Sequence, residues 1–186
     1  MPSYYIPKEE FRIVKYDEIL PYVENAPDLE YSIFIQIGYI TGMRLSEIIN
    51  LKASDFYINE KERELTISHK ALKFGKVGYA TFSFDDPFVM NIINYVRGFN
   101  PEDYIFHRRS KSSYQKMLLK LNRQLHKNNY QKYITFHYLR HSRITFLARI
   151  LKAFPEELKA WTGHRSMAFE DYYMPRKVER FKGQFQ

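Results

Sequence analysis

The sequence contains no cysteine among its 186 residues. A disulfide framework and thiolate chemistry are therefore excluded, and this composition fits a cytoplasmic protein. No stretch approaches the roughly 18 apolar residues of a membrane span. The first residues, Met1-Pro2-Ser3-Tyr4-Tyr5, do not have the pattern of a secretory signal peptide. We therefore expect a protein that has no membrane partner.

Acidic residues are absent from one long stretch of the chain. Residues 104–155 contain 12 Lys or Arg and no Asp or Glu. The remaining residues carry 17 Lys or Arg against 21 Asp or Glu, so the whole net charge of +8 originates in that stretch. A field of one sign in part of a domain is expected of a protein that binds a polyanion. The stretch lacks a long Lys-rich helix with a bulky apolar face, which favours nucleic acid over an anionic membrane.

Hydrophobic patterning predicts a single α+β domain that is mainly α and carries a small three-stranded antiparallel sheet. The length and the 45% hydrophobic content suit one well-cored domain. Helices are expected over residues 14–25, 29–41, 45–49, 87–97, 112–128, 136–152, 155–162 and 166–173. Strands are expected over residues 56–58, 64–68 and 79–84, with a glycine-containing hairpin tip over 73–78. An N-terminal arm (1–13), the domain (14–175) and a C-terminal tail (176–186) complete the division.

Caps and helix breakers mark several of these boundaries. Gly42 ends the apolar helix 29–41, and Pro21 is expected to disturb the first helix. Candidate N-caps, each a Ser or Thr before a helical pattern, are Thr41 or Ser46, Ser112 or Ser113, and Thr135.

Two segments combine an arginine with a second functional side chain. In Phe136–Ser142, His137 and Arg140 share one helical face, so Arg can grip two phosphate oxygens while His moves a proton. Alone, such a pair is more often a solvated helix face. In Thr41–Ile48, a glycine turn places Arg44 beside a helix N-terminus, and Glu47 can support it. Alone, this segment is an ordinary helical corner with a weak ion pair.

Three further features are weak when each is taken separately. Lys73 and Lys76 lie on the predicted hairpin tip, where most lysines are merely solvated. Thr162-Gly163-His164 places a histidine just past a helix end. Tyr172-Tyr173 follows, although most of the 16 tyrosines must be packing residues. A tyrosine hydroxyl becomes a nucleophile near neutral pH when nearby cations stabilise its oxyanion.

The order of these features resembles the catalytic set of the tyrosine recombinases, the phage integrase family. TGMRLSEI looks like the family's first-Arg box, and the hairpin with Lys73 looks like its β-hairpin lysine. HYLRHS matches the His-x-Leu-Arg-His box, and WTGHRS is similar to the Leu-Gly-His box, with Trp161-Thr162 replacing the usual pair. The family places its nucleophile nine residues after that histidine, as Tyr173 follows His164. The resemblance covers residues 14–174 and implies the tyrosine recombinase catalytic-domain fold.

The resemblance implies an enzyme that cuts and rejoins DNA as a recombinase or integrase. The implied catalytic residues are Arg44, Lys73, His137, Arg140, His164 and Tyr173, with Glu47 in support. The arginines would hold the scissile phosphate, and the lysine would protonate the 5′-oxygen leaving group. His137 would assist proton transfer, His164 would bind the phosphate, and the tyrosine would form a 3′-phosphotyrosyl link. The resemblance implies no cofactor and no metal, because the covalent link would store the energy of the phosphodiester. The sequence is consistent with this, since it has no clustered Asp/Glu set of the kind that a two-metal nuclease needs.

The expected partner is double-stranded DNA, with self-association on it. The expected DNA contacts from the basic stretch are Arg108, Arg109, Lys111, Lys116, Lys120, Arg123 and Arg143. Family members usually carry an N-terminal helical domain that completes a clamp round DNA. Because about 13 residues precede the first helix, we expect either an excised catalytic domain or a minimal recombinase. It would act in the cytoplasm of a prokaryote or of the host of a virus or plasmid.

Several alternatives remain open at this point. Lys76 is the alternative to Lys73, and Tyr172 is the alternative to Tyr173, since one helical step turns a side chain by about 100°. His141 is expected to face away from Arg140 and to make a structural hydrogen bond. Whether the role is integration or resolution is open, and two rival functions remain. One is a type IB-like topoisomerase, which would relax supercoils without strand exchange. The other is a non-catalytic DNA-binding protein, which would form no covalent adduct.

Overall fold

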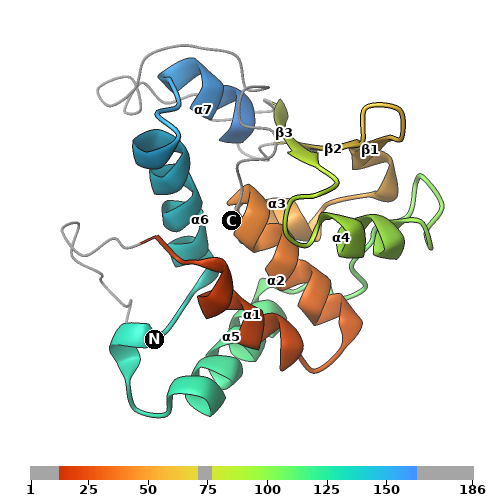
Figure 1. The fold of residues 1–186 in the computed structure, drawn as a ribbon. Helices are drawn as coiled ribbons and strands as arrows, with labels where there is room; N and C mark the ends of the chain where they lie inside the picture. Colours follow the sequence, from red (N-terminus) through yellow and green to blue (C-terminus); the bar gives the residue numbers. More distant parts are fainter. Residues whose placement is uncertain (1–12, 71–76, 163–186) are drawn as a thin grey trace.

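The structure is a computed structural model that describes residues 13–70 and 77–162 (Figure 1). The helices in this part are α1 (Tyr16–Glu24), α2 (Leu29–Thr41), α3 (Leu45–Ile49), α4 (Val89–Val96), α5 (Lys111–His126), α6 (Phe136–Thr145) and α7 (Pro155–Thr162). Short 3₁₀ turns are η2 (Ala53–Asp55) and η3 (Tyr130–Lys132), and η4 (Phe146–Ile150) is a π-helix. Strands β1 (Phe56–Asn59), β2 (Glu64–Lys70) and β3 (Val77–Ser83) form an antiparallel sheet in the order 1-2-3. The predicted mainly helical fold with a small sheet is confirmed.

Helix α2 is the centre of the core. It is apolar nearly all round, and every residue from Ile33 to Thr41 is buried, as expected for a helix without a polar face. Figure 1 shows α6 and α4 on either side of it, and α1 also packs against it. The Phe34 ring stacks on Tyr114 of α5, with centroids 3.7 Å apart, and meets Phe106 and Phe136 edge-on. One aromatic side chain therefore joins α2 to α5, to α6 and to the loop before α5.

The sheet is joined to the helical core by its buried face and by α7. Along β2, Leu65, Ile67 and His69 are buried while the residues between them are more exposed, which is the alternation of a strand. Helix α7 packs against β3. The Trp161 ring meets Phe82 of β3 edge-on, with centroids 5.1 Å apart. The end of α7 is thereby fixed beside the sheet.

The N-cap of α3 differs from the predicted Thr41 or Ser46. The cap residue is Arg44, whose backbone N–H donates to Glu47 Oε2 at 2.9 Å. The Thr41 hydroxyl instead lies one turn earlier and accepts from the Met43 N–H at 3.1 Å. A carboxylate inside the helix therefore replaces the hydroxyl cap that the sequence suggested.

Two other helix starts are also displaced from their predictions. Helix α5 begins at Lys111 after Ser110, rather than after Ser112 or Ser113. Helix α4 begins at Val89 and not at Pro87, because Phe88 has a φ of 69°, outside the helical region.

In α1 and α6, the structure shows the outcome of the predicted helix breaker, N-cap and helix end. Helix α1 continues through Pro21, whose carbonyl accepts from both the backbone and side-chain N–H groups of Asn25. The Thr135 hydroxyl caps α6 as predicted, accepting from the Tyr138 N–H at 3.0 Å. The helix predicted over 136–152 is α-helical to Thr145 and then π-helical, with the Leu151 N–H bonded to the carbonyl five residues back.

Several predictions fall outside the described residues. These are residues 73–76 of the hairpin tip, the helix over 166–173, the C-terminal tail and nearly all of the N-terminal arm. The last two residues of the predicted tip, Val77 and Gly78, belong to β3. The division into arm, domain and tail therefore stays a prediction. Within residues 13–70 and 77–162, no helix is long and apolar enough to cross a membrane.

The turn after α2 requires glycine for two independent reasons. Gly42 has a φ of 67°, and its N–H closes the helix by donating to the Gly38 carbonyl at 3.0 Å. A Cβ atom at this position would also lie 2.9 Å from Arg143 Cβ on α6. The neighbouring atom is attached directly to backbone, so it cannot easily move away. Gly42 therefore allows α6 to approach the end of α2.

We predict that Gly42→Ala destabilises the domain by about 2–5 kcal/mol, because a left-handed L residue costs roughly 1–2 and overpacking roughly 1–3. Urea unfolding followed by circular dichroism measures the change. Gly98→Ala is the matched control, since its Cβ would meet its nearest non-adjacent atom, the Tyr95 carbonyl oxygen, at 3.4 Å. Equal stability of the two variants would contradict the role assigned to Gly42.

Candidate active site

The C-terminal end of α2 carries three buried carbonyl groups that receive side-chain donors. The last carbonyls of a helix lack partners within the helix and form the negative end of its dipole. Arg143 Nε donates to the Tyr39 carbonyl (3.0 Å), Trp161 Nε1 to the Thr41 carbonyl (2.7 Å) and Arg140 Nη1 to the Gly42 carbonyl (2.9 Å). The end of α2 thus brings together α6, which carries the His-x-Leu-Arg-His box, and α7, whose last two residues begin WTGHRS.

Arg140 is held at this helix end as a buried cation. Its side chain is 6% exposed, and one guanidinium nitrogen is bonded to the Gly42 carbonyl. Burial lowers the pKa of Arg140 to about 10, helped by repulsion from Arg44 and opposed by Glu47. The group therefore stays charged near neutral pH. Its planar fork is fixed in direction by the carbonyl contact, which suits two-point binding of an oxyanion.

Arg44 presents its charge from the first turn of α3. Its Nη1 donates to Glu47 Oε1 at 3.2 Å, and its backbone N–H donates to the other carboxylate oxygen. The Arg44 side chain is 40% exposed, whereas that of Glu47 is 1% exposed. A buried carboxylate therefore anchors an accessible guanidinium. This geometry differs from the weak surface pair considered for the sequence alone.

His137 and His141 lie one turn apart on α6 and face each other. Their Nε2 atoms are 2.8 Å apart, so one ring donates and the other accepts. Burial, followed by repulsion from Arg140 and Arg44, lowers the pKa of His137 below its ordinary value. Burial, then His137 and Arg140, lowers the pKa of His141. The hydrogen bond expected for His141 is present, and its partner is another residue of the predicted site.

Sequence reasoning missed His69, which lies on β2 and is buried. Its Nε2 is 2.9 Å from the Trp161 carbonyl, and its Nδ1 is 3.5 Å from Glu47 Oε2. Burial is the main cause that lowers the pKa of His69. The alternation of β2 was the available signal, because it places residue 69 on the same buried face as Leu65 and Ile67.

The described residues of the site form a cationic cluster suited to an oxyanion. Arg44 lies close enough to Arg140 to help lower the pKa of Arg140, and both arginines lower the pKa of His137. Paired guanidinium groups of this kind bind and polarise phosphate. In the ranges that the structure covers, no three His, Cys, Asp or Glu side chains are placed to hold a metal ion. The predicted residues that fall outside these ranges are Lys73, Lys76, His164, Tyr172 and Tyr173.

Comparison with known proteins places this site in a family. The sequence pattern described as the phage integrase family matches residues 9–179. The chain belongs to this family. No curated protein matches the chain. The family resemblance inferred from the sequence boxes is therefore confirmed over nearly the whole chain.

Solved recombinases share the fold of this integrase-family chain. The XerA recombinase gives a TM-score of 0.65 at 22% identity, over 95% of this chain and 65% of that one. The XerH recombinase, solved bound to difH substrate in a pre-cleavage complex, gives 0.63 at 20% identity over 90% and 51%. A lambda integrase dimer bound to a COC′ core site gives 0.58 at 13% identity over 86% and 47%. This chain therefore spans about half to two thirds of the length of these proteins.

The basic residues predicted to contact DNA fall into two groups in the integrase fold. Lys111, Lys116, Lys120 and Arg123 are all exposed on α5. The last three follow i, i+4, i+7 spacing, so they form one stripe along the helix. We call Lys116, Lys120 and Arg123 the α5 stripe. These side chains are accessible to solvent, and their contact with DNA stays a prediction.

The remaining three arginines of that prediction are engaged within the protein. Arg108 pairs with Asp28 and Glu30 at the start of α2, and Arg109 bonds the Ile49 carbonyl and Asn50 at the end of α3. Arg143 is 5% exposed and bonded to α2. The exposure expected of Arg143 as a DNA contact is therefore wrong. Two carboxylates attract Arg108, whereas Arg109 and Arg143 bond carbonyl groups near the C-terminal ends of helices, where the dipole favours a cation.

We predict that Arg44→Gln raises the pKa of His137, because a cation that disfavours the imidazolium form is removed. Proton NMR of the imidazole C–H signals against pH measures this, with His137→Gln providing the assignment. In the unaltered protein we expect His137 to titrate below the ordinary histidine value of about 6.5.

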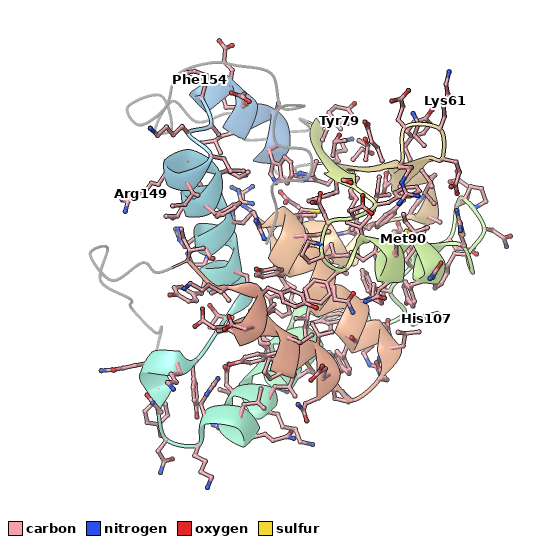
Figure 2. All side chains as sticks on the ribbon, in the orientation of Figure 1. Lys61, Tyr79, Met90, His107, Arg149 and Phe154 are labelled. Atoms are coloured by element: carbon pink, nitrogen blue, oxygen red, sulfur yellow. The ribbon has the colours of Figure 1, made fainter. Side chains whose placement is uncertain are left out.

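Arg149→Gln is the matched control for this titration. Arg149 is exposed on η4, and Figure 2 shows it pointing away from the body of the domain. It removes the same charge and should leave the His137 curve in place. An unchanged curve in Arg44→Gln would contradict the electrostatic contact between the two residues.

Proposed function

We propose that this integrase-family chain is a site-specific recombinase or integrase that cleaves and rejoins DNA through a 3′-phosphotyrosyl intermediate. The supporting observation is the convergence of Arg44, Arg140 and His137 at the end of α2. Two guanidinium groups beside a neutral imidazole provide anion binding and proton transfer at one place. Family membership supports the same assignment. It is also the basis on which we propose roles for the residues outside the described ranges.

In the proposed reaction, the Tyr173 oxygen attacks the phosphorus of one phosphodiester. A bond forms between that oxygen and phosphorus, and the bond to the 5′-oxygen breaks. The tyrosine proton passes towards His137, and Lys73 gives a proton to the departing 5′-oxygen. His164 adds a hydrogen bond to the phosphate. The reverse attack by a 5′-hydroxyl reseals the strand, so the covalent link conserves the energy of the broken bond. Lys76 and Tyr172 remain the alternatives to Lys73 and Tyr173.

The electrostatics of the described cluster agree with these roles. The lowered pKa of His137 keeps its imidazole neutral near neutral pH, and a neutral ring is able to accept a proton. Arg140 keeps its charge, since its pKa is lowered only to about 10. The two side chains therefore take opposite protonation states, one to hold the phosphate and one to take a proton.

The proposed partner is double-stranded DNA, and the proposed location is the cytoplasm of the host cell. The α5 stripe supplies exposed cations outside the catalytic cluster. Of the three neighbours named above, the XerH recombinase is bound to difH substrate and the lambda integrase is a dimer bound to a core site. We extend both properties to this chain as proposals: DNA binding through the stripe and the cluster, and self-association on the DNA.

A nicked suicide duplex that carries candidate sites tests the proposed chemistry. We expect the unaltered protein and Tyr172→Phe to form a covalent adduct on a denaturing gel, and Tyr173→Phe to form none. We expect Arg140→Gln to slow adduct formation by about 100-fold or more, the typical loss when one donor to a developing charge is removed. An adduct that survives Tyr173→Phe but not Tyr172→Phe would exchange the two tyrosines. If the unaltered protein forms no adduct, the proposed cleavage activity is wrong and the rival function, a non-catalytic DNA-binding protein, is favoured.

A second prediction concerns the α5 stripe. Alanine at Lys116, Lys120 and Arg123 together should weaken DNA binding and lower the salt slope by about 2–3, since each phosphate contact contributes about 0.9. Fluorescence anisotropy at several salt concentrations measures both quantities.

The control variant for the stripe removes three positive charges elsewhere, by alanine at Lys61, Arg63 and Arg97. Lys61 points away from the domain at the turn between β1 and β2 (Figure 2). The two arginines form exposed pairs with Asp85 and Glu60 that contribute little to stability. An equal loss of salt slope in the control would show that only net charge matters, and would contradict the stripe.

A further inference from the structure

One buried histidine lies between two groups, and each of these groups holds a different part of the site in place. His69 is 3% exposed, and the proposed reaction gives it no role. Its Nε2 lies 2.9 Å from the Trp161 carbonyl in the last turn of α7. Its Nδ1 lies 3.5 Å from Glu47 Oε2, the carboxylate that anchors Arg44. A side chain on β2 therefore bridges α3 and α7.

The partner of Nε2 fixes the tautomer of this ring. A carbonyl oxygen can only accept, so Nε2 carries the hydrogen that is donated to Trp161. In the neutral ring, Nδ1 then has a lone pair and no hydrogen, and it makes no hydrogen bond in the structure. That lone pair faces Glu47, which is buried as well. Protonation of Nδ1 would create a donor directed at the carboxylate.

The charges around His69 determine how readily its ring is protonated. Glu47 favours the protonated ring, whereas Arg140 and Arg44 disfavour it, and burial disfavours it most. A phosphate bound between the two arginines would offset their charge. The pKa of His69 therefore depends on the carboxylate that holds Arg44, and it would change if an anion occupied the cationic cluster.

An ordinary core histidine does not account for these contacts. The buried face of β2 is otherwise apolar, with Leu65 and Ile67 at the preceding inward positions. A leucine at position 69 would fill space, but it would leave the Trp161 carbonyl without this donor. It would also remove the polar ring that lies 3.5 Å from Glu47 Oε2. The polar ring thus makes contacts that an apolar side chain packed in the same place could not make.

We propose that His69 is a positioning residue, which holds the last turn of α7 through the Trp161 carbonyl and places that turn beside Glu47, the carboxylate that anchors Arg44. The last turn of α7 leads in sequence directly into Gly163-His164, so its position bears on the second half of the site. This assignment rests on the proposed function where cleavage is the readout. The contacts themselves are testable without any cleavage.

The first test is a long-range proton–nitrogen NMR spectrum of the histidine rings in the full chain. We expect His69 to be neutral near pH 7, with the hydrogen on Nε2. Glu47→Gln should lower the pKa of His69 further, because it removes the anion that favours protonation. A ring with its hydrogen on Nδ1, or a titration that is indifferent to Glu47→Gln, would overturn the proposal whether or not the protein cleaves DNA.

The second test compares two amide replacements for the rate of adduct formation on the suicide duplex. The amide nitrogen of His69→Gln can reach the position of Nε2 and restore the donor to Trp161, whereas His69→Asn is too short to do so. We expect a loss of about tenfold to a hundredfold for His69→Asn, since the buried Trp161 carbonyl loses the donor that holds the last turn of α7. We expect at least a threefold recovery for His69→Gln relative to His69→Asn.

His107→Gln is the matched control, because His107 lies in the loop before α5, outside the cluster (Figure 2). Its adduct rate should equal that of the unaltered protein. Equal losses for His69→Gln and His69→Asn, with both variants folded, would overturn the positioning role. If the unaltered protein forms no adduct while the NMR signature is as expected, the proposed function fails and the contacts of His69 stand.

Discussion

The constraint on which this structure depends is the burial of the C-terminal end of α2. Water cannot solvate the carbonyl groups there, so each needs a donor from elsewhere in the chain. Arg143 and Arg140 come from α6, and Trp161 comes from α7. Because these donors must reach fixed carbonyl positions, the depth and rotation of both helices are determined by one helix end. Gly42 makes the approach sterically possible, since any Cβ there would collide with α6.

This arrangement also explains how the domain tolerates two buried arginines close together. A buried cation is destabilising unless its charge is compensated, and both Arg140 and Arg143 donate to carbonyl groups at the end of α2. The negative end of the α2 dipole supplies part of the compensation. Burial nevertheless lowers the pKa of each to about 10, which shows that the compensation is incomplete. The remaining excess of positive charge is a property that an anionic ligand can use.

Local signals in the sequence predicted much of the fold, whereas the inner contacts of the site depend on distant partners. Helix α2 matched its predicted limits because its apolar run and Gly42 are both local features. Arg143 was misplaced because a count of charges contains no information about the Tyr39 carbonyl, 104 positions away. His69 was missed for the same reason, since Trp161 is 92 positions away. The boxes predicted candidate reactive side chains, but not the groups that orient them.

The same charges that would hold a phosphate also influence the protonation of the histidines before the phosphate binds. Without an anion, Arg44 and Arg140 disfavour protonation of His137, so its ring is neutral and can accept a proton. A phosphate bound between the arginines would reverse part of that effect, raising the proton affinity of the ring when a nucleophile must lose its proton. His141 lies within hydrogen-bond distance of His137 and would feel the change through their contact. In the proposed reaction, binding and proton transfer would thus be coupled through the electrostatics of one cluster, with no conformational change required.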